Sequence, residues 1–189
     1  MGVEVMYMKY TKYQYSRNLA WEILLRERVR QLPVEIIPIC KHMGIRVLRY
    51  SDMPSLQFNA GGSSAEIGGK MYIFYDDTVS PERQRFTVAH ELGHIIMRHS
   101  GAEDNEAEAN VFASRLLMPA CVLYACEVKT ADEIMSLCAV SRQAAEIRLT
   151  RLAELRRRDK FYTHPLEQKV ARRFQSFIKA YRRFQSTHP

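Results

Sequence analysis

The chain has 189 residues, of which 47% are hydrophobic and 26% are charged, and its formal net charge is +7 at pH 7. This composition is typical of a globular protein with a buried core, and no apolar run approaches the roughly 20 residues of a membrane helix. The first 18 residues lack a hydrophobic signal core, and the four cysteines form no C-x-x-C pair. We therefore expect a cytoplasmic protein with reduced, buried thiols and no membrane partner.

The first part of the chain predicts two helices followed by short strands. Residues 16–32 carry apolar residues at helical spacing, with Ser16 as a candidate cap, and a second helix over 34–43 ends at Gly44. Alternating apolar runs then predict three strands, over residues 45–50, 55–58 and 71–76. Glycines and serines between the last two runs indicate turns, so this region is interpreted as an antiparallel meander.

Strong start and stop signals follow for two longer helices. Ser80 and Pro81 form a cap and a first-turn proline, which predict a helix over 80–99. A second helix over 104–118 is stopped by Pro119. These two helices carry most of the residues with chemical potential.

The C-terminal part predicts a helix pair and a basic tail. Thr130 opens a capping box, and Ser141 caps a further helix after a short turn, which gives a helix-turn-helix outline over 130–155. From Arg156 onward the sequence has ten basic residues and only two acidic ones, and its apolar residues recur at helical spacing. The basicity of the chain therefore belongs to its tail.

The motif HELGH at residues 90–94 predicts a metal site. His90 and His94 are four residues apart, so on a helix they project from one face, one turn apart, and can bind a single zinc ion. Glu91 lies at the edge of that face, where it can act on a metal-bound water without binding the metal. Zinc lowers the pKa of its bound water to about 7, and a carboxylate can then take the proton and pass it to a leaving amine. Together these groups predict peptide hydrolysis with Glu91 as the catalytic residue.

A catalytic zinc takes three protein ligands, so a third must come from a neighbouring helix. The acidic cluster at 103–108 supplies the candidates, and acidic decoration of a helix N-terminus explains Glu103 and Asp104. Glu106 is favoured because Asn110 lies one turn further on the same face, where its amide can hydrogen-bond a ligand from behind. Glu108 remains the alternative.

Two segments, RFTVAHELGH and EAEANVFASRLLMP, resemble the ImmA/IrrE family of small zinc metallopeptidases. The match is dense over about residues 70–120, and the helix-turn-helix outline also fits. The resemblance implies one Zn²⁺ held by His90, His94 and Glu106, with Glu91 as the acid/base. It also implies an endopeptidase that cleaves a helix-turn-helix transcriptional repressor and relieves repression, in mobile-element or stress regulation. The alternative is a zinc-stabilised regulator that binds a repressor or DNA without cutting.

Other parts of the site are less determined by the sequence. Residues 71–76 are candidates for an edge strand that pairs with an extended peptide substrate, or else for an ordinary core strand. The oxyanion of the tetrahedral intermediate needs a stabilising group, for which Tyr72, Arg85 and His99 are candidates. The sequence does not choose among these three.

The helix-turn-helix outline permits contact with DNA. Arg142, Gln143 and Arg148 are the candidates to face bases, and the basic tail would strengthen phosphate binding. We favour the interpretation that these helices pack on the protease core and contact a protein partner, because phosphate attraction alone gives no base specificity. DNA is therefore a less favoured partner than a protein substrate.

The predicted fold is α+β, with a small antiparallel three-stranded sheet packed on helices in a minimal gluzincin-like arrangement. Helix-turn-helix-like helices and a basic helical tail follow at the C-terminus. The expected domains are a metallopeptidase domain over 1–126, a helix-turn-helix-like segment over 127–155 and the basic tail over 156–189.

Overall fold

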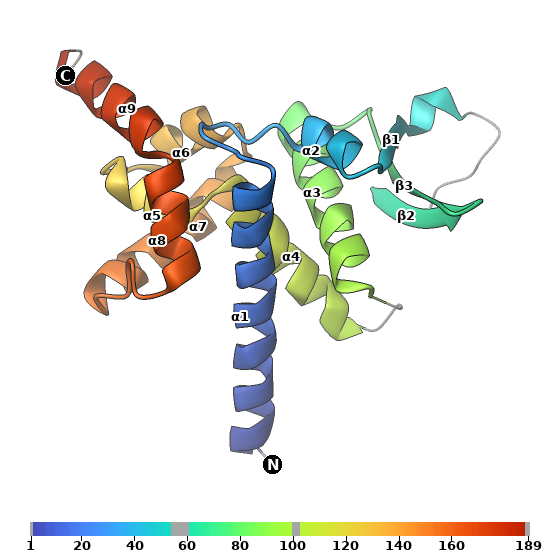
Figure 1. Cartoon of the computed structure of the whole chain (residues 1–189), viewed down its shortest axis with the longest axis horizontal. Coiled ribbons are helices and arrows are strands. Elements are labelled where there is room, and N and C mark those ends of the chain that lie inside the picture. Colours follow the sequence, from blue (N-terminus) through green and yellow to red (C-terminus); the bar gives the residue numbers. More distant parts are fainter. Residues whose placement is uncertain (1, 54–60, 100–102, 188–189) are drawn as a thin grey trace. The chain divides into compact units, whose positions relative to one another are not determined.

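The computed structural model describes residues 2–53, 61–99 and 103–187 (Figure 1). The chain forms two compact units: Met1–Ala20 with Glu35–Ala113, and Trp21–Val34 with Ser114–Pro189. The first unit combines helices with a small sheet, and the second is built from helices. The α+β class expected from the sequence is confirmed.

The sheet is mixed rather than purely antiparallel, so the predicted meander is wrong. Its strands are β1 (Arg46–Arg49), β2 (Gly62–Ile67) and β3 (Lys70–Tyr75), in the order β1-β3-β2. β3 pairs antiparallel with β2 and parallel with β1, so that Val47 lies opposite Ile73. The chain leaves β1, forms the β2–β3 hairpin and places β3 between its two neighbours. Local sequence patterns indicate hairpins, whereas the pairing of β1 with β3 is a long-range contact.

β2 occupies a segment that the sequence predicts as turns. Gly68 and Gly69 do form a turn, with φ of +58° and +73°, the two positive values that a tight type I′ hairpin requires. The six residues before them are extended and pair along the whole of β3. Glycine and serine lowered the strand signal here, but pairing with an apolar partner strand overrides it. The predicted strand over 55–58 lies outside the described residues.

Three helices complete the part of the first unit around the sheet. α2 (Ile36–His42) contacts β1 and α3, and α3 (Pro81–Met97) packs on β2 and β3 (Figure 1). α4 spans Glu103–Leu117, close to the predicted bounds. The buried apolar residues of these elements include Ile39, Ile73, Phe74, Val88, Ala89, Leu92, Ala109 and Phe112. This core fixes α3 and α4, and with them the residues of the predicted site.

The first helix starts well before the predicted cap. α1 spans Gly2–Arg26, and Ser16 lies in its interior, fully buried. The Ser16 hydroxyl donates to the carbonyl of Lys12, one turn earlier, which satisfies it without a helix end. Ser16 as a cap is therefore wrong.

The second unit contains the helix pair and the tail predicted from the sequence. The helices wholly within this unit are α5 (Ala120–Ala125), α6 (Ala131–Cys138), α7 (Arg142–Arg157), α8 (Pro165–Arg173) and α9 (Gln175–Thr187). The Thr130 capping box and the Ser141 cap are both formed. α5 was not expected, because Pro119 was interpreted only as a stop, whereas it also serves as the N-cap of the next helix.

The sequence predicts no membrane helix and no disulfide bonds. Among the described residues, the helices lack the combination of length and apolar character that crossing a membrane requires. All four cysteines are free and buried, and burial raises the pKa of Cys40, Cys121 and Cys126 to about 12. Thiols with such pKa values are poor nucleophiles near neutral pH.

Candidate metal centre

α3 presents two imidazoles to the same point. The Ser80 side chain accepts a hydrogen bond from the Arg83 amide and so caps the helix. The helix then places His90 and His94 one turn apart, with ring centroids separated by 4.7 Å. The Nε2 atoms of the two rings lie 2.9 Å from each other. Two nitrogen atoms facing each other at this distance are suited to share a cation.

Glu106 on α4 completes a three-residue cluster. Its carboxylate oxygens lie 3.1 Å from His90 Nε2 and 3.2 Å from His94 Nε2. The three ligand atoms lie within 4.8 Å of one another, as the binding of one metal ion requires. Ligands at zinc bond lengths and tetrahedral angles are about 3.3 Å apart, so the spacing fits zinc. The Glu106 side chain is 64% exposed, which leaves this side of the cluster open to solvent.

A glycine lets α4 approach α3 closely enough for Glu106 to reach the two histidines. A Cβ atom on Gly93 would lie 3.0 Å from the Phe112 ring and 3.4 Å from Ala109 Cα. Both neighbours are on α4, two turns or less from Glu106. The glycine of HELGH therefore makes room for the helix that carries the third ligand.

The opposite ring nitrogens of both histidines have partners, and that of His90 sets its tautomer. His90 Nδ1 lies 3.0 Å from the Asn110 amide oxygen, which can only accept, so Nδ1 carries the proton and Nε2 is left with its lone pair. His94 Nδ1 lies 3.0 Å from His99 Nδ1. Burial, reinforced by the neighbouring His90, lowers the pKa of His94 and favours the neutral form that binds metals.

Glu91 lies beside the cluster in a different environment. Its side chain is buried, and Ser64 Oγ on β2 donates a 2.9 Å hydrogen bond to Glu91 Oε2. Burial raises the pKa of Glu91, while the Ser64 hydrogen bond acts in the opposite direction. A Cβ on Gly62 would lie 3.3 Å from Glu91 Oε1 and 2.2 Å from Thr87 Cγ2, so β2 packs closely on the helix here. A buried carboxylate with a raised pKa is suited to proton transfer.

Glu108, the alternative ligand, lies in another place. Its carboxylate is buried, with Oε2 3.5 Å from His99 Nε2 and Oε1 3.4 Å from Lys12 Nζ. It is not part of the His90, His94 and Glu106 cluster. The side chains of Glu103 and Asp104 lie outside the described residues.

The three oxyanion candidates lie in three different settings. His99 faces the rear nitrogen of His94, so it lies behind a predicted ligand. Tyr72 lies on β3, where its hydroxyl accepts a 3.4 Å hydrogen bond from Arg46. Arg85 lies in the first half of α3. None of the three belongs to the described metal cluster.

The predicted edge strand, residues 71–76, is the middle strand of the sheet. The strand β3, which covers most of this segment, is paired on both sides, so it cannot add an extended peptide. In the sheet formed by the described residues, β2 is an edge strand, and it carries Ser64 next to Glu91. Sequence reasoning missed Ser64 because no short-range pattern links a serine to a glutamate 27 residues later.

The DNA-contact candidates do not form a common surface. Arg148 is buried and donates to the Met118 carbonyl, so it does not face a DNA groove, and its assignment is corrected. Arg142 is exposed but forms a 2.6 Å ion pair with Asp132. Gln143 is exposed in the first turn of α7. The Arg148 guanidinium is itself buried and bonded to the main chain, a placement set by tertiary packing that periodicity alone does not reveal.

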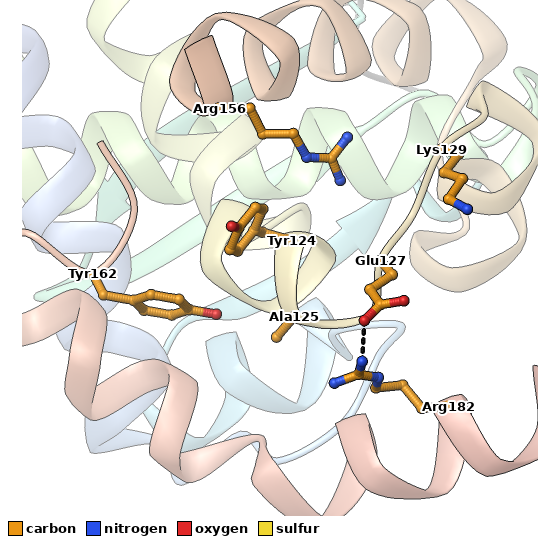
Figure 2. A pocket seen from close by; sticks show the side chains of 7 residues that line it. All are labelled: Tyr124, Ala125, Glu127, Lys129, Arg156, Tyr162 and Arg182. Atoms are coloured by element: carbon orange, nitrogen blue, oxygen red, sulfur yellow. Dashed lines mark hydrogen bonds and ion pairs between the residues drawn. The ribbon is translucent and has the colours of Figure 1, made fainter. Parts of the chain in front are cut away.

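The second unit contains a cavity of about 470 Å³, lined by residues that include Tyr124, Tyr162, Arg156, Glu127 and Arg182 (Figure 2). Arg156 lies over the Tyr124 ring, 5.5 Å from its centroid, and donates to the Val128 carbonyl. Figure 2 shows Arg182 paired with Glu127. Both arginines therefore have partners within the unit, and part of the tail's basic charge is used internally.

Comparison with known proteins agrees with this geometry. The model of the peptidase family described as the IrrE N-terminal-like domain matches residues 40–150, which is more than half of the chain. The matched region includes Glu91 and all three residues of the metal cluster. No curated protein matches the chain.

Proposed function

The chain belongs to the IrrE N-terminal-like family of metallopeptidases, and from this premise we propose that it is a zinc-dependent endopeptidase that cleaves a helix-turn-helix transcriptional repressor. The observation that carries the proposal is the convergence of His90 Nε2, His94 Nε2 and the Glu106 carboxylate on one point. Two imidazoles and one carboxylate form the ligand set of many catalytic zinc sites, in which a fourth position stays open.

The residues around the cluster have separate tasks. When bound, zinc would act as a Lewis acid that polarises the scissile carbonyl and makes water more acidic. His90, His94 and Glu106 would hold it, and Asn110 would orient the His90 ring. Glu91 takes the proton of the attacking water and then donates it to the nitrogen of the leaving amine. Ser64 holds the Glu91 carboxylate in position through its hydrogen bond.

We place the peptide substrate along β2. This strand lies at an edge of the described sheet, and its Ser64 contacts Glu91. An extended peptide added to the free edge would be held by main-chain hydrogen bonds, and its scissile bond would lie near the catalytic carboxylate.

The choice of a repressor as substrate rests on the resemblance to the ImmA/IrrE family. Cleavage of such a regulator would remove repression in one irreversible step. Nothing in the proposal requires DNA contact, and the burial of Arg148 removes one of the three candidate base contacts.

The first test measures metal content, with Glu106→Ala and Glu108→Ala beside the wild type. We expect about one zinc per chain, as for a mononuclear site. We expect Glu106→Ala to lose it and Glu108→Ala to keep a reduced occupancy. No bound metal in the wild type after zinc has been supplied would contradict the proposal.

The second test separates a peptidase from a non-cutting regulator. Glu91→Gln keeps the size and burial of the side chain but removes the base, so cleavage should fall by about 100-fold or more while metal content is unchanged. Cells that express the wild type or Glu91→Gln are compared by mass spectrometry of newly formed protein N-termini. New termini within a helix-turn-helix repressor, present only with the wild type, support the proposal. Identical sets of termini would favour the regulator.

A further inference from the structure

We propose that His99, Glu108 and Lys12 form a chain of polar contacts that positions the His94 ring toward the metal and links α1 to the metal centre. This inference rests on the proposed metal site and extends it to residues that are outside the ligand cluster. None of the three residues would touch the metal or the substrate, so they are positioning residues.

The chain is continuous from atom to atom. His94 Nδ1 lies 3.0 Å from His99 Nδ1, and His99 Nε2 lies 3.5 Å from Glu108 Oε2. Glu108 Oε1 is 3.4 Å from Lys12 Nζ. The side chains of His99 and Glu108 are only 8% and 9% exposed, whereas that of Lys12 is 41% exposed. The series therefore runs from the metal centre through a buried region to the surface.

The arrangement of these contacts determines which ring nitrogen of His94 and of His99 carries the proton. For His94 Nε2 to bind a metal it must carry a lone pair, so the proton is on Nδ1 and is donated to His99. His99 Nδ1 then accepts, so the His99 proton is on Nε2, which faces Glu108 Oε2 at 3.5 Å. A carboxylate at the end of such a series makes the metal-binding imidazole more basic and holds its orientation. Lys12 neutralises the buried carboxylate, which would otherwise be costly.

The backbone holds His99 in place for this role. Arg98 has a left-handed φ of +55°, which ends α3 and turns the chain back. The His99 amide then donates to the His94 carbonyl at 3.1 Å. The helix terminus thus brings His99 directly beside the ring that it contacts.

α1 contacts this region at two points one turn apart. Lys12 contacts Glu108 on α4, and Ser16 Oγ lies 3.4 Å from Met97 Sδ at the end of α3. Residues four apart on a helix share a face, so one face of α1 contacts both the last residue of α3 and the second turn of α4, the two helices that carry the candidate metal ligands. A displacement of α1 would therefore break the series at Lys12.

The experiment measures zinc affinity by competition with a chelator, using the full chain. The variants are His99→Phe, Glu108→Gln and Lys12→Met, and the matched controls are His42→Phe and Lys41→Met, on the exposed side of α2. We expect His99→Phe and Glu108→Gln to weaken zinc binding about 10- to 100-fold, the range typical of residues behind a ligand. Lys12→Met should have a smaller effect in the same direction, and both controls should bind as the wild type does.

Two further readouts separate positioning from a general loss of structure. The visible absorption spectrum of the Co²⁺ form should change in the positioning variants, because the ligand geometry changes. In the double variant His99→Phe with Glu108→Gln, the second substitution should add almost nothing, because Glu108 acts through His99. Unchanged thermal stability of the metal-free variants would exclude simple unfolding.

Several results would overturn the inference. Zinc affinities equal to that of the wild type, or additive effects in the double variant, would show that the series does not position His94. If His99→Phe does not fold, the nearly isosteric Glu108→Gln carries the test. If the wild type itself binds no metal, both the proposed function and this inference fail. If the wild type binds zinc and the variants bind it equally well, only this inference fails.

Discussion

Three of the four glutamates between positions 91 and 108 have different environments, and these environments separate their tasks. Glu106 is exposed and faces two imidazole nitrogens, which suits a metal ligand. Glu91 is buried beside Ser64, and its raised pKa suits proton transfer. Glu108 is buried between His99 and Lys12, where its charge is partnered. All three residues are glutamates, so their different roles come from their different partners and burial.

Removal of the Ser64 hydroxyl should shift the pH dependence of cleavage. Glu91 must be unprotonated to act as a base, and its raised pKa causes activity to fall as the pH decreases through a value above the usual glutamate range. The Ser64 hydrogen bond stabilises the carboxylate, so Ser64→Ala should raise the pKa further. We expect the acid limb of the kcat/KM profile to move to higher pH. Ser63→Ala, on the neighbouring residue of β2, is the control, and an equal shift in both variants would contradict the assignment.

The two helices of the centre meet because one position carries no side chain. Gly93 faces Phe112 and Ala109, and the approach of α4 brings Glu106 to the histidines. The caps at Ser80, Thr130 and Ser141 follow the sequence signals, because a cap depends on residues within one turn. The strand order does not follow such signals, because β1 pairs with β3 across the intervening strand β2 of the sequence, and no pattern within one strand specifies this long-range pairing.

A larger side chain at Gly93 should therefore separate the helices. Gly93→Val introduces atoms where a Cβ alone would lie 3.0 Å from Phe112, so we expect a loss of about 1–3 kcal/mol in the free energy of unfolding. Zinc affinity should fall with it, because Glu106 moves away from the histidines. Gly61→Val is the matched control, since a Cβ there meets no atom of the described residues within 4 Å. Denaturant unfolding of the metal-free forms and chelator competition measure the two effects, and equal behaviour of both variants would contradict the packing explanation.

The whole molecule divides into a unit that holds the metal cluster and a helical unit that holds the helix pair and the tail. The family match extends over residues 40–150 and so includes parts of both. In the first unit, the candidate metal ligands lie on α3 and α4, which share one core. In the second, the basic residues Arg142, Arg156 and Arg182 each have an acidic, aromatic or carbonyl partner. Of these three, Arg142 and Arg182 are paired with acidic residues of the same unit.

Metal should stabilise the folded chain, because the cluster exists only when α3 and α4 are packed. Zinc at about 100 times its dissociation constant should raise the free energy of unfolding by about 2.7 kcal/mol. A chelator should reverse the gain, and Glu106→Ala should show no gain. Thermal unfolding monitored by circular dichroism provides the measurement. A wild type whose unfolding is independent of zinc would contradict a metal site in the folded state.

Short-range patterns in the sequence were enough to predict the helices α3 and α4, the Ser80 cap of α3, the paired histidines and the chemistry that a HELGH helix supports. Each of these depends on residues within about one or two helical turns, and helix geometry converts such spacing directly into position. The choice of Glu106 over Glu108 was favoured by a local argument as well, since Asn110 lies one turn away on the same face.

Long-range packing decided the rest. The mixed sheet, the central place of β3, the contact of Ser64 with Glu91 and the series from His94 to Lys12 all join segments far apart in the chain. Arg148 is buried for the same reason, because its neighbours come from another helix and its loop. Such contacts form where apolar faces and hydrogen-bonding groups find partners in the folded core, and no local spacing specifies those partners.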